Sequence, residues 1–371
     1  MTQKIQSVFV ANSTYSLLTH LMYRAANGEQ SVDNFLKTTL LVAGPAIRDI
    51  PVLPAHKVVW TDQDRKSPTA EDRSTQSAAM HQAFWRQYDS GLPVYLNARV
   101  PFADNLLDYA DTATQNPYKK TDIRIVSDGL SDHDTFPMLV QRPSVTMCYS
   151  ATDILSTLRD PKIQTFDVLD LWQRTPAADR KTLSTVFNIS AETLDKASSK
   201  PVLVVTQPLS EDNMMAEADK IELYRRIISV YGADQVIIKP HPREKTDWTT
   251  VFPEAPVIPK QVPMELLARL AKLERIATFF STSAFGTLPD DRVDFYAKDF
   301  AMLKSYHPET VDERGFKSVA VSDVEEKNCK LHACNWLRLP DSDGRFYRSE
   351  KIATQQRDVP TDRLTPVHTR A

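Results

Sequence analysis

Glycine is scarce in this chain: only eight of its 371 residues are glycine, and they are scattered. The sequence contains neither a G-x-G-x-x-G fingerprint nor a G-x-x-x-x-G-K-[ST] loop, the patterns in which a glycine-rich backbone holds a phosphate. This absence argues against a dinucleotide-dependent oxidoreductase and against a P-loop enzyme. If the protein binds a phosphate, side chains and helix N-termini have to hold it.

Cysteine is scarcer still, and Cys148, Cys329 and Cys334 are the only three. Three scattered thiols do not form a disulfide framework, which indicates a reducing compartment. His332 lies between the last two cysteines, but the spacing is wrong for a zinc knuckle and a fourth ligand is missing. We therefore expect no metal site there.

A strong net charge and a long apolar run are also missing. Lys and Arg number 45 against 48 Asp and Glu, a net charge of −3, which gives no general attraction to nucleic acid or anionic membrane. No stretch approaches the ~20 apolar residues that span a bilayer, and residues 1–5 lack the apolar core of a signal peptide. We expect a cytoplasmic protein, at most peripheral to the inner membrane, with no nucleic-acid partner.

Short apolar segments alternate with helical ones through the first part of the chain. The segments with strand character are residues 8–11, 39–43, 58–60, 94–97 and 123–126. This alternation predicts α/β layers around a parallel sheet. Residues 151–200 are more polar, and we expect helices there, including residues 153–155 and 191–196.

A loop-like composition at residues 197–201 predicts a domain junction, followed by a second α/β unit. Its expected strands are residues 202–205, 236–238 and 276–280, and its expected helices are residues 216–231 and 264–273. We predict a first lobe at 1–198, a second at 199–328, and a tail at 329–371 that is helical and then frayed. The basic and aromatic residues of the tail leave two interpretations open, packing on the first lobe or contact with anionic lipid.

The most informative segment is Lys239-Pro240-His241-Pro242-Arg243, directly after the expected strand at 236–238. Proline fixes its own φ and disfavours helix for the residue before it, so this segment is held as a loop at the carboxyl end of a strand. Ligands of open α/β sheets bind at that end. One titratable ring between two cations suits an anionic leaving group such as a phosphate.

Two further polar motifs follow expected strands. Asp128-Gly129 comes after residues 123–126, where the Asp either serves as a general base or simply forms a turn. Ser281-Thr282-Ser283 follows residues 276–280 at an expected helix start, where hydroxyls and backbone N–H groups suit either an anion or plain N-capping.

The order and spacing of these motifs resemble the bacterial lipooligosaccharide sialyltransferases of glycosyltransferase family 52, in which an acidic-Asp-Gly motif, a His-Pro motif and a serine motif follow one another. The most specific match is residues 277–285, Ala-Thr-Phe-Phe-Ser-Thr-Ser-Ala-Phe, followed by residues 290–296, which resemble the family's next strand. The resemblance covers most of the second lobe, and the first lobe only through topology and Asp128-Gly129. It implies a GT-B-like fold, with two Rossmann-like lobes facing a cleft, the acceptor on the first and the nucleotide-sugar donor on the second.

The resemblance also implies inverting transfer, without a metal or other cofactor, from a CMP-activated sugar to a glycan acceptor. The expected donor is CMP-sialic acid, and the expected acceptor is a galactose-type hydroxyl of lipooligosaccharide, O-antigen or capsule. His241 hydrogen-bonds or protonates the departing phosphate, and prepositioned cations and dipoles stabilise its growing charge. The residues expected to bind the donor phosphate are Lys239, Arg243, Ser281, Thr282 and Ser283.

The identity of the general base stays open. The family's first motif carries two adjacent acids, whereas Ser127 precedes Asp128 here. Asp128 is the preferred base. Asp212, in the region after the strand at 202–205, is the alternative, because some members of the family place the base there.

Other functions stay open as well. A relative on the same scaffold uses another donor, such as CMP-Kdo or a nucleotide-glucose, and a nucleotide-sugar epimerase is an alternative from another enzyme class. A metal-requiring transferase needs an Asp-x-Asp triplet, which occurs at 62–64, 132–134 and 341–343. The alternative outside enzymes is a glycan-binding module. The sequence does not determine the oligomeric state.

Overall fold

The structure is a computed structural model that describes residues 4–44, 46–47, 50, 56–59, 92–97, 107, 110–111, 122–127, 132–150, 160–279, 281–284, 287–288 and 290–297. The chain divides into two compact units, the first including Met1–Val186 and the second Phe187–Ala333. This division lies ahead of the junction expected at 198/199, so α8 (Ala191–Ala197) is part of the second unit. Both units are α/β, as predicted.

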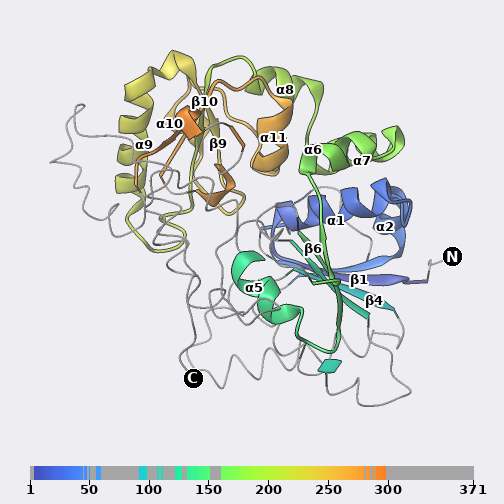
Figure 1. The fold of residues 1–371 in the computed structure, drawn as a ribbon. Helices are drawn as coiled ribbons and strands as arrows, with labels where there is room; N and C mark the ends of the chain where they lie inside the picture. Colours follow the sequence, from blue (N-terminus) through green and yellow to red (C-terminus); the bar gives the residue numbers. More distant parts are fainter. Residues whose placement is uncertain are drawn as a thin grey trace, which may run out of the picture. The chain divides into compact units, whose positions relative to one another are not determined.

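The first unit is built on a seven-stranded sheet with the strand order β3-β2-β1-β4-β5-β6-β7. All neighbouring strands pair in parallel. Helices α1 and α2 cover one face of the sheet, and α5 lies on the other (Figure 1). The strands are β1 (Ser7–Ala11), β2 (Thr39–Ala43), β3 (His56–Val59), β4 (Pro93–Asn97), β5 (Asp122–Val126), β6 (Val145–Ser150) and β7 (Ile163–Thr165), and the helices are α1 (Thr14–Ala26), α2 (Val32–Thr38), α5 (Asp132–Leu139), α6 (Val168–Arg174) and α7 (Ala177–Phe187).

The central strands of this sheet are buried on both faces, which is why they are apolar without a polar alternation. On one face Val8 and Ile125 pack in a cluster with Phe136 of α5. On the other face Phe9 stacks on His20 of α1, with ring centroids 4.4 Å apart. The hydrophobic runs that predicted these strands therefore mark a core with two sides.

The second unit has a four-stranded parallel sheet with the order β11-β10-β8-β9. Helices α9 and α10 lie on one side of it and α8 and α11 on the other (Figure 1). Its strands are β8 (Val202–Val205), β9 (Val236–Lys239), β10 (Arg275–Thr278) and β11 (Val293–Phe295), its α-helices besides α8 are α9 (Glu217–Tyr231), α10 (Trp248–Val251) and α11 (Met264–Leu270), and its 3-10 helices are η4 (Ala233–Gln235), η5 (Thr282–Ala284) and η6 (Asp290–Arg292).

Most predicted elements are confirmed. The expected helical region at 151–200 contains strand β7, and β6 precedes it; neither strand was predicted. Helix α11 ends at Leu270 instead of residue 273, because Ala271 already has extended backbone. The predicted helix at 153–155 and the tail at 329–371 lie outside the described residues.

No helix in the described parts of the chain is long and apolar enough to cross a membrane.

Candidate functional site

Three loops meet at one edge of the second sheet. Strands β8, β9 and β10 are parallel and adjacent, so their carboxyl ends lie at the same edge, where α/β sheets bind ligands. The loop after β8 carries Asp212, the loop after β9 carries His241, and Ser281 follows β10. Strands β9 and β10 flank β8, and two strand spacings separate their ends by roughly 9–10 Å, a distance that a nucleotide phosphate and its ligands can bridge.

The His241 imidazole is held in one orientation by its own loop. Its Nδ1 accepts the backbone N–H of Arg243 at 3.1 Å, and its backbone N–H donates to Glu244 Oε2 at 2.7 Å. Burial, then the positive charges of Arg243 and Lys239, lower the pKa of His241 to about 3. The ring is therefore neutral near pH 7, and because Nδ1 is an acceptor, the proton sits on Nε2. His241 thus offers an Nε2–H donor at the carboxyl end of β9.

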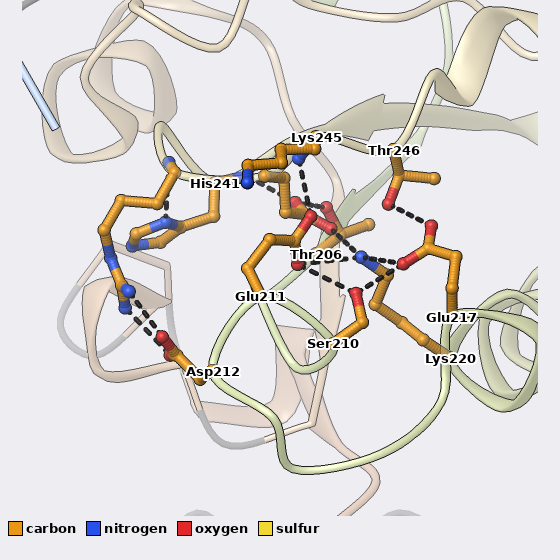
Figure 2. A network of polar contacts seen from close by, with 11 residues as sticks. Thr206, Ser210, Glu211, Asp212, Glu217, Lys220, His241, Lys245 and Thr246 are labelled. Carbon is orange, nitrogen blue, oxygen red and sulfur yellow. Dashed lines mark hydrogen bonds and ion pairs between the residues drawn. The ribbon is translucent and has the colours of Figure 1, made fainter. Parts of the chain in front are cut away.

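Arg243 and Asp212, both singled out in the sequence, are paired with each other. The two guanidinium nitrogens of Arg243 reach the two carboxylate oxygens of Asp212 at 2.5 and 2.9 Å. This fork geometry is the one in which arginine also binds phosphate. Asp212, the candidate base, and Arg243, a candidate phosphate ligand, are therefore bound to each other (Figure 2).

Lys239 has backbone partners of its own in the structure. Its side chain is buried, and Nζ donates to the carbonyl oxygens of Pro240 at 2.6 Å and Lys260 at 3.2 Å. Burial lowers its pKa to about 8, although the negative charges of Glu265 and Glu244 oppose this shift. This geometry gives Lys239 a part in holding the loop, and its contact with a donor phosphate stays a prediction.

The serine motif leads into a short 3-10 helix, η5, at the position where the sequence predicted a helix start. Ser281 is buried, and its Oγ lies 2.9 Å from Ser283 Oγ. The N–H of Ala284 donates to the carbonyl of Ser281 at 3.2 Å. The two hydroxyls therefore contact each other just after β10, and phosphate binding by Ser281, Thr282 and Ser283 stays a prediction.

Asp128, the preferred general base, lies outside the described residues, as does Gly129. The side chains of the Asp132-His133-Asp134 triplet lie outside them too. Among the side chains that the structure describes, no group of three or more His, Cys, Asp or Glu is arranged to hold a metal ion.

Sequence reasoning missed the acidic and basic residues beneath the His241 loop. Glu244 is buried and accepts from the His241 N–H, and Lys220 of α9 is fully buried beside it. A signal was present for Lys220. It precedes Leu223, Tyr224, Ile227 and Ile228 at helical spacing, so a lysine stands on the apolar stripe of α9.

Residues 146–299 match the model of Glycosyltransferase family 52. The match includes the His241 loop and the serine motif. The chain is also 34% identical over 189 residues to an uncharacterized protein of Haemophilus influenzae, across 50% of this chain and 60% of that protein. The chain thus spans less than two thirds of this curated relative.

Solved structures with a similar arrangement share little sequence with this chain. The UDP-GlcNAc 2-epimerase of Methanocaldococcus jannaschii in complex with UDP-GlcNAc and UDP is 12% identical, with a TM-score of 0.46 over 89% of this chain and 99% of that one. S. aureus MnaA with UDP is 12% identical, with a TM-score of 0.39 over 74% of this chain and 73% of that one. Similarities this low carry no inference about function. The sequence match does: it confirms the predicted resemblance, since residues 146–299 match the model of glycosyltransferase family 52.

Proposed function

We propose that this protein is a glycosyltransferase that moves sialic acid from CMP-sialic acid to a galactose-type hydroxyl of a bacterial surface glycan. The observation that carries the proposal is the neutral imidazole of His241. Its Nδ1 accepts the Arg243 N–H, so its Nε2–H is the hydrogen-bond donor at the carboxyl end of β9, within the residues that match the family model. A neutral hydrogen-bond donor suits a CMP phosphate that gains negative charge as it departs. The match to the family model supports the transferase class, and the donor and acceptor are our proposal.

The proposed reaction is a single displacement with inversion at the anomeric carbon. The acceptor oxygen attacks that carbon, the bond from the carbon to the CMP phosphate oxygen breaks, and the electron pair leaves with CMP. A carboxylate takes the acceptor's hydroxyl proton. His241 donates a hydrogen bond from Nε2 to the departing phosphate, and this bond strengthens as the phosphate gains negative charge. The hydrogen-bonding role fits the structure better than full protonation, because the lowered pKa leaves few rings charged near pH 7.

Asp212 is the one candidate base whose side chain the structure describes. Both of its oxygens are bound by Arg243, so it accepts a proton well only after Arg243 turns to another anion. A donor phosphate is such an anion, and its binding to Arg243 would free Asp212. Asp128 stays the preferred base, and comparison of Asp128→Asn with Asp212→Asn decides between them.

The test is a donor screen with CMP-sialic acid and CMP-Kdo against galactosides, with His241→Ala as the inactive control. Thermal-shift measurements with CMP, CDP and UDP accompany it. Transfer from CMP-sialic acid together with stabilisation by CMP supports the proposal. Stabilisation by UDP alone points to an epimerase or a glucosyl donor, and no response to any nucleotide points to a glycan-binding module. Transfer that stops in EDTA and returns with Mg²⁺ would overturn the expected independence from metal.

A further inference from the structure

A buried ammonium group lies beneath the His241 loop. Lys220 of α9 has no exposed side-chain surface, and its Nζ lies 3.0 Å from Glu211, 3.0 Å from Glu217 and 3.7 Å from Glu244. Nζ also lies 5.9 Å from the centre of the Trp248 ring. A buried lysine is costly unless carboxylates compensate its charge. Here three carboxylates, from three different parts of the unit, converge on one cation.

Each of these carboxylates also holds the segment after β9 (Figure 2). Glu244 Oε2 accepts the backbone N–H of His241 at 2.7 Å and the hydroxyl of Thr206. Glu211 Oε1 accepts the backbone N–H of Lys245 at 2.6 Å. Glu217 Oε1 accepts the Thr246 hydroxyl at 2.7 Å. The three acids thus hold the segment at its beginning and at its end, and Lys220 holds the three acids.

The charges of this network depend on the lysine. Burial raises the pKa of Glu244, and the positive charge of Lys220 is among the effects that oppose this rise. Burial acts on Glu211 in the same direction, but hydrogen bonds from the Lys245 N–H and from Lys220 outweigh it and lower its pKa to about 2. Without the ammonium group, the buried carboxylates of Glu211 and Glu244 would be left without its positive charge in a poorly solvated space, where like charges favour protonation. A protonated Glu244 binds the His241 N–H less strongly, because a charged acceptor makes the stronger hydrogen bond.

The network also reaches the other side of the site. Glu211 precedes Asp212, which pairs with Arg243 on the His241 loop. Two sets of contacts therefore connect the loop after β8 to the loop after β9. One is the partly exposed pair of Arg243 and Asp212, and the other is buried Lys220, which contacts Glu211 and Glu244.

We propose that Lys220 is a positioning residue for the transfer reaction: through Glu244, Glu211 and Glu217 its ammonium group fixes the loop that aims His241 Nε2 at the leaving phosphate. This inference rests on the proposed function for its catalytic consequence, but not for its effect on His241 itself. Misplacement of a catalytic group by about 1 Å costs roughly 10²-fold in rate. The hydrogen bond from His241 strengthens in the transition state, so the loss falls on kcat more than on KM.

The test compares Lys220→Met with Lys220→Arg and with Arg225→Met. Arg225 lies on the same helix but is 56% exposed and pairs with Glu222, so its replacement removes a cation without reaching the loop. In Lys220→Met we expect about 10²-fold lower kcat with CMP-sialic acid and a KM within a few-fold of wild type. Lys220→Arg, which keeps the charge, should recover part of the rate, and Arg225→Met should behave as wild type.

Two measurements on the protein alone separate positioning from a general loss of stability. Nitrogen-15 NMR of the His241 ring reads its tautomer, and amide hydrogen exchange reads the His241 and Lys245 N–H groups. In Lys220→Met we expect a mixed tautomer and faster exchange at both amides, while amides of β8 keep their protection. If Lys220→Met does not fold, Glu244→Gln carries the same test, because it keeps the shape of the side chain and removes the charged acceptor.

The outcomes distinguish the two proposals. If wild-type protein transfers no sugar from any CMP donor, the proposed function fails, and the NMR and exchange results still decide whether Lys220 positions His241. If wild type is active but Lys220→Met, or Glu244→Gln in its place, keeps the wild-type tautomer, exchange rates and kcat, the positioning role is overturned.

Discussion

Asp212 and a donor phosphate compete for Arg243, and this competition can be measured by removing the charge of Asp212. The bidentate pair holds both nitrogens of the guanidinium fork, and both side chains are 31% exposed. A phosphate that uses the same fork has to displace the carboxylate first. The substitution Asp212→Asn therefore lowers the cost of phosphate binding.

The size of the effect follows from the exposure of the pair. Ion pairs with this much contact with water are worth about 0.2–1 kcal/mol, and the two-pronged geometry favours the upper part of that range. About 1 kcal/mol corresponds to roughly fivefold in Kd. We expect Asp212→Asn to bind CMP about two- to fivefold more tightly than wild type and to lose no more than about 1 kcal/mol of unfolding free energy.

The assay is isothermal titration calorimetry with CMP, run beside sugar transfer from CMP-sialic acid. Asp219→Asn is the matched control, because it removes the same charge from an exposed position in the first turn of α9. If Asp212 is the general base, transfer falls about 10²–10⁴-fold while CMP binding improves. If Asp128 is the base, transfer stays near wild type. Weaker or unchanged CMP binding in Asp212→Asn, with Asp219→Asn unchanged, would refute the competition.

Three further predictions concern the same unit. His241→Ala should lower transfer by about 10²–10⁴-fold without changing the circular dichroism spectrum, and near-wild-type turnover would contradict the mechanism. The folded-state pKa of His241, about 3, lies below the ordinary value of 6.5, so its contribution to stability is complete above about pH 6.5 and is lost as the pH falls toward 3. Between about pH 7.5 and 4.5, the free energy of unfolding in urea should therefore fall less in His241→Gln than in wild type. Trp248 is buried and packs against the rings of Tyr224 and Phe252, so Trp248→Ala should lower the free energy of unfolding by about 3–5 kcal/mol in a urea measurement. A loss below about 1 kcal/mol would contradict tight packing of this ring.

The sequence predicts the strands of this fold best where a sheet is buried on both faces. Strands β2 and β8 coincide with the predicted residues, because each is buried along its whole length and its sequence is a nearly continuous apolar run. Strand β6 was missed because exposed Thr146 interrupts its apolar pattern. Strand β7 has three residues, of which Gln164 and Thr165 are exposed, so an edge strand of this kind carries almost no hydrophobic signal.

The polar loops of the candidate site were predictable from the sequence, but the contacts between their side chains were not. Proline on both sides of His241 indicates a loop at a strand end, and the structure confirms that loop. The contact between Arg243 and Asp212 depends on the adjacency of β8 and β9, and strand order is not visible in local sequence. Because the sequence does not show the pairing, it assigned Arg243 to the phosphate and Asp212 to the acceptor proton as independent roles, whereas in the structure the two side chains bind each other.

For Lys220, the sequence of α9 predicts burial and one acidic partner but not the other two. A lysine on the apolar stripe of α9 is expected to be buried, and a buried ammonium group requires acidic partners. Glu217 lies one turn earlier on the same helix, so it was predictable as one partner. Glu211 and Glu244 reach Lys220 only because their loops follow neighbouring parallel strands. The same strand adjacency that hides these partners from the sequence is what allows one buried cation to hold two loops, and it explains why a residue with no exposed surface should influence the chemistry at the edge of the sheet.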